Sequence, residues 1–210
     1  MNQEYFLTSR HGGVGSTAMF HNKDEKGYGS DLRNLETYSV EKAQKHHDHY
    51  GRDSLPLLVT KVLAASTKRV DHQYINFNEG MARPGQLCVV TNPRDCDGND
   101  IFFRAKANHR MHWTPNLDEA LVYKFEEVPN LGSSLMPWSL TYMTTKARPT
   151  FQLKNINTRS MCRGIKLKKK YTPRDSGKVR WNCPACGKIS WQYNPYDFEG
   201  CSDINCSEWR

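Results

Sequence analysis

The first 80 residues contain short stretches in which hydrophobic and polar positions alternate, and their pattern predicts a small α+β unit. Alternation over residues 4–8 and 17–21 predicts two strands, and the glycines between them predict a turn. The apolar run at residues 55–67 fits either a helix or a buried strand. Residues 70–77 have the composition of a strand.

One segment of this half has helical character. Ser39 is a suitable N-cap for a helix over residues 40–49, which Gly51 would end. Three histidines, His46, His47 and His49, cluster at its C-terminal end. Neighbouring positions on a helix point in different directions, so we interpret them as a solvated helix end, where histidine suits the dipole, in preference to a metal site.

The second half repeats this pattern with new residues. Residues 86–91 and 101–105 predict two strands joined by a hairpin turn, and residues 138–143 and 151–155 predict two more. Between these pairs, Asn116 and a glutamate three positions later form a capping box that would open a short helix.

Both halves therefore run strand, turn, strand, loop, helix, with an acidic, leucine-containing approach to the helix at residues 30–43 and 114–127. We predict an α+β fold with antiparallel sheet, built by a divergent internal duplication. From the N-terminus, we expect a first unit at 1–80, a second at 81–160, a basic linker at 161–180 and a small cysteine-containing module at 181–210.

Composition favours a folded protein outside membranes. The chain has 210 residues, 37% of them hydrophobic and 11% aromatic, with a mean hydropathy of −0.78. The longest apolar run, residues 55–65, is too short to span a bilayer, and the first residues do not have the pattern of a secretory signal. We expect a cytoplasmic protein, whose cysteines are metal ligands or buried thiols.

Positive charge is concentrated in one segment. The formal net charge is +8, and residues 151–182 contain ten Lys or Arg against a single acid, Asp175. The rest of the chain is close to neutral, so any attraction to polyanions is local.

Directly after the basic segment, four cysteines have the spacing C-x2-C-x14-C-x4-C: Cys183, Cys186, Cys201 and Cys206. Two pairs of thiolates suit a tetrahedral zinc ion, and four thiolates leave no open position, so we predict a structural zinc site. The aromatic residues around the motif are expected to form a small apolar cluster: Trp191, Tyr193, Tyr196, Phe198 and Trp209. Redox-active cysteines are the alternative. The other cysteines, Cys88, Cys96 and Cys162, share no metal-binding spacing.

The basic segment interleaves cations with aromatic rings, a pattern that suits a phosphate backbone and stacked bases. The candidate nucleic-acid-binding residues are Lys166, Lys168, Lys169, Lys170, Tyr171, Arg174, Lys178, Arg180 and Trp181. The alternative is a solvated linker.

Two further patterns could indicate catalysis. Residues 9–17, SRHGGVGST, resemble a phosphate-binding glycine loop but have no lysine before the serine, so a hairpin loop is favoured. The candidate ligand-pocket residues there are His11, Ser16 and His21. Asp71, His72 and Asn92 resemble the HNH nuclease pattern, but Pro93 and a predicted strand stand where that pattern needs a helix. The sequence therefore favours a non-enzymatic protein over an enzyme.

One stretch of the first half, GYGSDLRNLETYSVEKAQ, resembles a module of short uncharacterised bacteriophage accessory proteins. The positions that carry the resemblance are Gly27, Tyr28, Asp31, Leu32, Leu35, Tyr38, Ser39, Glu41 and Ala43. The C-terminal motif is similar to zinc ribbons of the transcription and translation machinery.

These resemblances imply a phage-encoded accessory or host-takeover factor that contacts nucleic acid or a host nucleoprotein machine. A nucleotide- or nucleic-acid-processing enzyme and a protein–protein inhibitor of a host factor are the alternatives. A structure with His11, His72 or His112 beside a carboxylate in a cleft would favour the enzyme.

Overall fold

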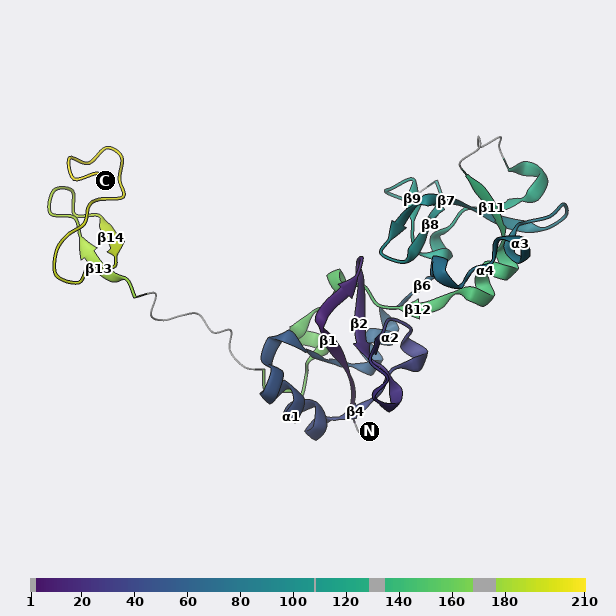
Figure 1. Ribbon diagram of the computed structural model, residues 1–210, viewed down its shortest axis with the longest axis horizontal. Helices are drawn as coiled ribbons and strands as arrows, with labels where there is room; N and C mark the ends of the chain where they lie inside the picture. The colour runs from purple at the N-terminus through teal and green to yellow at the C-terminus, as the bar shows by residue number, and fades with distance from the viewer. Residues whose placement is uncertain (1–2, 108, 129–134, 168–176) are drawn as a thin grey trace. The chain divides into compact units, whose positions relative to one another are not determined.

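The computed structural model describes residues 3–107, 109–128, 135–167 and 177–210. The chain forms two compact units, a body (residues 1–168) and a C-terminal module (residues 169–210) (Figure 1). Helices and antiparallel sheets are both present, so the α+β fold class is confirmed.

The body contains two successive series of the same elements. The first series is β1 (Glu4–Val14), β2 (Thr17–His21), β3 (Tyr28–Gly29), β4 (Tyr38–Ser39), α1 (Val40–Tyr50), β5 (Pro56–Leu58), α2 (Val59–Ala64), β6 (Thr67–Arg69) and α3 (Phe77–Gly80). The second is β7 (Leu87–Asp97), β8 (Asp100–Arg104), β9 (Trp113–Thr114), β10 (Val122–Lys124), β11 (Met136–Ser139), α4 (Leu140–Lys146), β12 (Arg148–Thr150) and α5 (Thr158–Met161). The second series has a 3₁₀ turn where the first has α1.

The two sheets of the body share strand order and register. One has the order β3-β2-β1-β4 with β5 also paired to β1, and the other has β9-β8-β7-β10 with β11 also paired to β7. Thr8 faces Phe20 in the first hairpin, as Thr91 faces Phe103 in the second, and both hairpins shift register beyond these pairs. The halves are therefore alike in topology and in residue pairing.

The halves are joined by strands β6 and β12, which pair antiparallel (Figure 1). Lys68 at the centre of β6 faces Pro149 at the centre of β12, so the two-stranded ribbon relates one half to the other by an approximate two-fold axis. This arrangement places β6 and β12, each with the segment that follows it, at the junction of the halves.

Each half completes its core with a segment from the other. The N–H of Ala18 donates to the carbonyl of Phe151 at 2.8 Å, and the N–H of Ile101 donates to the carbonyl of Val70 at 3.0 Å. Phe151, Met161 and Cys162 of the second half pack in the first core. Val70, Ile75 and Met81 of the first half pack in the second core.

A buried charge cluster lies at the junction of the halves. The Arg69 side chain is 1% exposed and its Nη1 lies 2.7 Å from Asp97 Oδ2 and 3.2 Å from Asp100 Oδ2. Arg148 Nη2, from the paired strand, lies 2.7 Å from Asp100 Oδ1 and 3.3 Å from Asp71 Oδ2. Buried charges are tolerated when they are paired in this way.

Several local predictions are confirmed and others are wrong. α1 begins after Ser39, whose Oγ accepts from the Lys42 N–H at 3.4 Å, and it ends before Gly51, as expected. The ambiguous run at residues 55–67 contains both a strand, β5, and a helix, α2.

The strands predicted at residues 70–77, 138–143 and 151–155 are short turns and helices over most of their lengths. In two of these segments, polar side chains satisfy the first N–H groups of a helix. Asp71 accepts from Gln73, and Ser139 accepts from the Tyr142 N–H at 3.5 Å.

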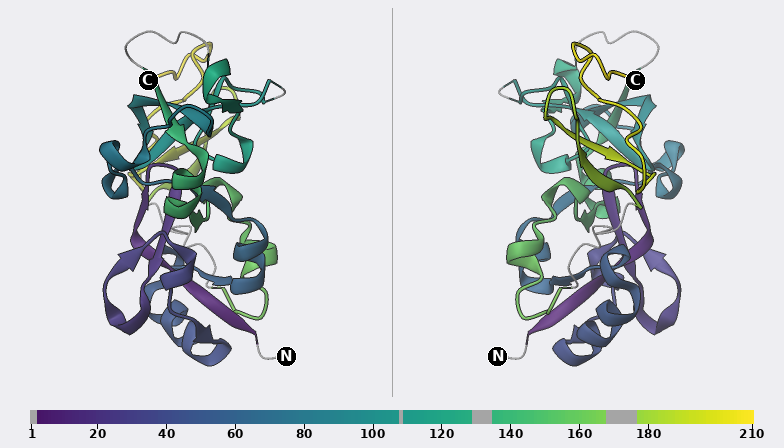
Figure 2. Two further views of the ribbon diagram at one scale, coloured as in Figure 1. Left: turned by 90° about the vertical axis from the view of Figure 1, so that its right-hand side faces the viewer. Right: turned by 90° about the vertical axis from the view of Figure 1, so that its left-hand side faces the viewer.

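Most positions of the sequence motif at residues 27–43 have structural roles. Leu32, Leu35 and Ala43 are buried, while Asp31 and Ser39 cap a 3₁₀ turn and α1. α1 packs through Ala43 against the start of β1 (Figure 2). The motif therefore specifies local fold.

None of the helices in the described residues combines the length and the apolar character needed to cross a lipid bilayer.

Candidate metal centre and adjoining surface

The four cysteines of the C-terminal motif converge on one point. Their Sγ atoms all lie within 4.8 Å of one another. Cys183 Sγ is 3.6 Å from Cys206 Sγ, and Cys186 Sγ is 3.6 Å from Cys201 Sγ. Four sulfurs around a tetrahedral metal at about 2.3 Å would be about 3.8 Å apart, so the spacing fits a single ion.

Two loops hold these thiols. Cys183 follows β13 (Val179–Asn182) and Cys186 precedes β14 (Ile189–Gln192), the two strands of an antiparallel hairpin. The N–H of Gly187 donates to the Cys183 carbonyl at 2.9 Å, and Gly187 has a φ of 73°, a conformation that favours glycine.

The second pair of cysteines lies on an irregular loop closed by backbone hydrogen bonds. The Cys206 N–H donates to the Asp203 carbonyl at 3.0 Å, and the Arg210 N–H donates to the Cys201 carbonyl at 3.2 Å. Lys188 forms an ion pair with Asp203, which links the hairpin to this loop.

The electrostatics of the first loop favour a thiolate. Burial raises the pKa of the Cys183 thiol, but backbone N–H groups of Cys186 and Ala185 outweigh this effect and lower that pKa to about 7. N–H groups directed at a sulfur stabilise its negative charge, which is the form that binds metal.

The chemistry of the centre is that of a closed site. Within the described part of the chain, these cysteines are the one group of three or more His, Cys, Asp or Glu side chains close enough to share a metal ion. Four thiolates saturate a tetrahedral ion, so such a centre supports structure. The predicted four-cysteine cluster is thus confirmed.

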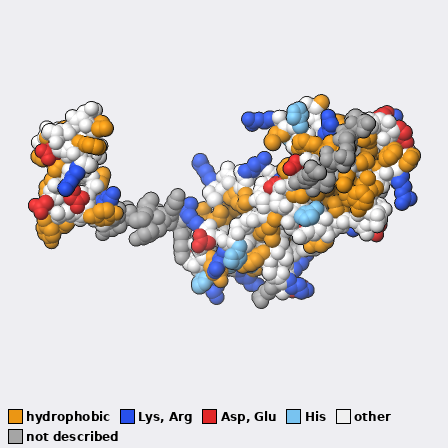
Figure 3. All heavy atoms as spheres, turned by 45° about the horizontal axis from the view of Figure 1, so that its top comes forward, with side chains coloured by type: hydrophobic (Ala, Val, Ile, Leu, Met, Phe, Trp, Pro, Cys, Tyr) orange, Lys and Arg blue, Asp and Glu red, His pale blue; other side chains and the backbone are white. Residues whose placement is uncertain are grey.

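One face of the β13–β14 hairpin presents cations beside aromatic rings. Arg180 pairs in register with Trp191, and both side chains are exposed. The Lys178 ammonium lies 5.1 Å from the centre of the Tyr193 ring. Because side chains alternate along a strand, these four residues share the exposed face. Figure 3 shows hydrophobic and basic side chains together on the surface of this module.

The expected apolar cluster of aromatic residues is wrong for most of its members. Trp191 is 60% exposed, Tyr193 65%, Tyr196 86% and Trp209 56%. Phe198 alone is packed as expected, with its ring centroid 6.3 Å from that of Trp181. The alternation of polar Ser190 and Gln192 with Trp191 and Tyr193 predicts the opposite arrangement, because in this hairpin the two polar side chains are the buried ones.

The predicted nucleic-acid-binding residues divide into three groups. Lys178 and Arg180 lie on the exposed hairpin face, whereas Trp181 points to the opposite face. Lys166 belongs to the body, where its N–H donates to Gln44 Oε1 at 2.7 Å. The remaining members lie outside the described residues: Lys168, Lys169, Lys170, Tyr171 and Arg174.

Two of the three candidate ligand-pocket residues contact the same ring. His11 and His21 pack against Tyr28, with ring centroids 5.7 Å and 4.9 Å from that of the tyrosine. Ser16 instead bonds to Asp97 and Arg69 in the buried charge cluster. His72 Nδ1 bonds to the carbonyl of Asn99 at 2.9 Å.

The HNH-like set is dispersed among structural roles. Asp71 pairs with Arg148, and Asn92 lies within strand β7. His112 is exposed. A nearby histidine, His109, does meet a carboxylate, with its Nε2 3.1 Å from Glu119 Oε2.

The histidines at the end of α1 form part of an aromatic group on the body. The His46 and His21 rings are 5.2 Å apart and nearly perpendicular, and His46 Nε2 is 2.8 Å from Ser54 Oγ. Burial lowers the pKa of His46 to about 4, and the neighbouring charge of His21 adds to the effect. His46 is therefore neutral in the folded protein near pH 7.

This pKa predicts acid sensitivity of the body. The folded-state pKa lies below the usual 6.5, so the unfolded chain binds the proton more readily and stability rises with pH. The contribution is complete above pH 6.5 and is lost as the pH falls toward about 4. We expect His46→Gln to flatten this part of the stability profile, measured by urea unfolding across the range. The exposed His112→Gln variant is the control, and an unaltered profile for His46→Gln would refute the assignment.

Comparison with protein-family models, curated proteins and solved structures gives no match to this chain.

Proposed function

We propose that this protein is a non-enzymatic zinc protein that binds single-stranded nucleic acid through the exposed face of the β13–β14 hairpin. The observation that supports this most strongly is the pairing of Arg180 with the exposed Trp191, next to Lys178 and Tyr193. Cations beside exposed planar rings are the arrangement that holds phosphates while bases stack.

The exposed rings favour unpaired bases over a duplex. Bases inside a duplex are stacked on their neighbours, so a protein ring can reach their faces in single strands, loops or ends. The basic residues that precede the hairpin in sequence would add sequence-independent attraction to the backbone. Both contributions tolerate any base sequence.

Zinc is the metal that best fits the centre. A set of four thiolates with tetrahedral spacing is typical of zinc or an iron–sulfur cluster, and a single ion suits sulfurs 3.6 Å apart. The proposed role of the ion is to hold the hairpin and the 201–206 loop together, because this module lacks an extensive apolar core.

The direct test replaces Trp191. We expect Trp191→Ala to weaken binding of a fluorescently labelled single-stranded oligonucleotide by about 5- to 150-fold, since loss of one stacked base costs about 1–3 kcal/mol. Fluorescence anisotropy of the full-length protein measures this change, with metal content checked to show that the module is intact.

Tyr196→Ala is the matched control, because Tyr196 is a more exposed aromatic residue of the same module outside the hairpin. It should bind as the unaltered protein does. Binding should also weaken steeply as salt is added and should be stronger for single strands than for duplexes. Equal affinity of the Trp191→Ala and Tyr196→Ala variants, or binding indifferent to salt, would contradict the proposal.

We extend the proposal to the biological setting. The resemblance of residues 27–43 to bacteriophage accessory proteins supports a phage-encoded factor that acts on nucleic acid or a nucleoprotein machine in the host cytoplasm. Affinity capture from host cells with and without nuclease treatment tests this, because partners held through nucleic acid are released by nuclease.

A further inference from the structure

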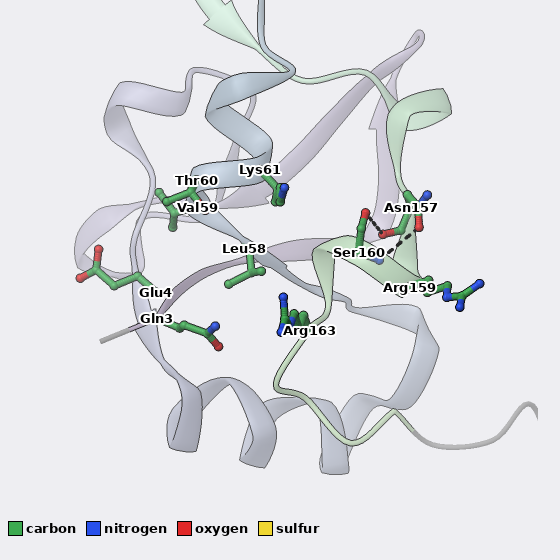
Figure 4. Close-up of a pocket in the computed structure, with 10 residues that line it drawn as sticks. All are labelled: Gln3, Glu4, Leu58, Val59, Thr60, Lys61, Asn157, Arg159, Ser160 and Arg163. Atoms are coloured by element: carbon green, nitrogen blue, oxygen red, sulfur yellow. Dashed lines mark hydrogen bonds between the residues drawn. The ribbon is translucent and has the colours of Figure 1, made fainter. Parts of the chain in front are cut away.

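The body contains a pocket of about 660 Å³ that is remote in sequence from the cysteine motif. It lies between the start of β1, the junction of β5 with α2, and α5 (Figure 4). Three cations line it, Lys61, Arg159 and Arg163, against one acid, Glu4. Its volume is within the range of about 300–1,000 Å³ that is common for small-molecule sites.

One cation of the pocket replaces an aromatic ring of the other half. Trp138 and Tyr142 stack there, with ring centroids 6.2 Å apart, and the Tyr142 hydroxyl accepts from the Asn76 N–H at 2.6 Å. Lys61 occupies the position relative to the start of α2 that Tyr142 occupies relative to the start of α4. A charged side chain therefore lines the pocket where the other half has a packed ring.

The cations of the pocket are not required by the fold. Lys61, Arg159 and Arg163 are exposed, and none forms an ion pair with a described residue. Their counterparts at the same positions relative to α4 and α3 are uncharged: Tyr142, Asn78 and Ala82. The same local fold therefore forms without positive charge, which leaves these side chains available for a ligand.

The lining suits an anionic ligand that also has an apolar part. Lys61 and Arg163 project from opposite sides toward the space beside Leu58, while Arg159 extends away along the rim (Figure 4). A guanidinium and an ammonium together bind a phosphate well. Leu58 and Val59 supply an apolar wall for a base.

We propose that this pocket binds a nucleotide, with the phosphate between Lys61 and Arg163 and the base against Leu58 and Val59. The nucleotide could be free in solution or part of a nucleic-acid strand, and the chemistry of recognition is the same. The site belongs to the body, so it stands or falls independently of the function proposed for the hairpin face.

The test removes the two charges proposed to hold the phosphate. The double variant Lys61→Gln with Arg163→Gln changes exposed side chains of the pocket that form no ion pair with a described residue. Isothermal titration calorimetry of the full-length protein with AMP, CMP, GMP and UMP in turn measures binding of the free nucleotide. We expect at least one mononucleotide to bind, with at least tenfold lower affinity for adenosine or inorganic phosphate alone, and at least a tenfold loss in the double variant.

The control is Arg83→Gln with Lys154→Gln, which removes the same charge from exposed positions of the body outside the pocket. It should bind nucleotide normally. If mononucleotides do not bind, a labelled oligonucleotide should still bind the pocket variant several-fold more weakly than the control, which would identify a nucleotide within a strand. If the pocket variant matches the control with both probes, the proposal is overturned.

Trp191→Ala separates the two proposals. It should leave mononucleotide binding in the pocket unchanged and weaken oligonucleotide binding at the hairpin. Loss of mononucleotide binding in this variant would overturn the assignment of the nucleotide to the body.

Discussion

Removing the metal, or replacing Cys183 by serine, is expected to unfold residues 177–210 and leave the body folded. The module has one two-stranded sheet, and most of its aromatic side chains are exposed, so apolar burial contributes little to its stability. Metal binding supplies on the order of 10 kcal/mol or more in small sites of this kind. Loss of dispersed amide NMR signals from the module, with those of the body retained, measures the effect.

Cys96→Ser provides the control, since Cys96 is an exposed thiol of the body. Metal analysis should find one zinc ion per chain in this variant and in the unaltered protein, and less in Cys183→Ser. A module that keeps its dispersed signals after chelation would contradict a structural metal centre.

Replacing Arg69 by methionine is expected to destabilise the body by about 3–5 kcal/mol, the usual cost of removing one partner of a buried ion pair. The Arg69 side chain is 1% exposed, and its removal would leave Asp97 without its cation and Asp100 dependent on Arg148 alone. Urea unfolding followed by circular dichroism measures the change.

Lys68→Met is the neighbouring control. Lys68 lies beside Arg69 in β6, but its side chain is 56% exposed and pairs with an exposed Asp118. Exposed pairs contribute about 0–1 kcal/mol, so this variant should unfold close to the unaltered protein. Equal stability of the two variants would show that the buried cluster does not hold the halves together.

The exchange of core segments should also affect how the body unfolds. Each half packs a segment of the other half in its core. Arg69 lies in β6, the strand that pairs with β12 and joins the halves. We expect the body to unfold in one cooperative transition, because neither core is complete without the other half.

Much of the local structure follows from short-range rules. Ser39 caps α1 and Gly51 ends it, and the two-residue turn at Gly98 joins β7 to β8, because caps and turns depend on neighbouring residues. The strands predicted at residues 70–77 and 151–155 are wrong because long-range contacts determine these segments. These segments are apolar because they enter the core of the other half, and apolar side chains that pack there do not require a strand.

The candidate sites divide in the same way. The spacing of four cysteines predicts that they meet, and their Sγ atoms all lie within 4.8 Å of one another. The hairpin face and the pocket beside Lys61 could not be found by spacing. Trp191 is exposed because Ser190 and Gln192 take the buried face of β14, and Lys61 lines the pocket at the position where the other half has a stacked tyrosine.

The sequence alone determined the α+β class, the positions of the hairpins and α1, and the four cysteines of the candidate metal centre. Each depends on residues close together in the chain or on a fixed chemical spacing. The tertiary structure decided the exchanged segments, the pairing of β6 with β12, the buried Arg69 cluster and the open pocket beside Lys61. The first three features depend on contacts between the two halves, which form only when the chain has folded. The pocket depends on which side chains each half places around the same local fold.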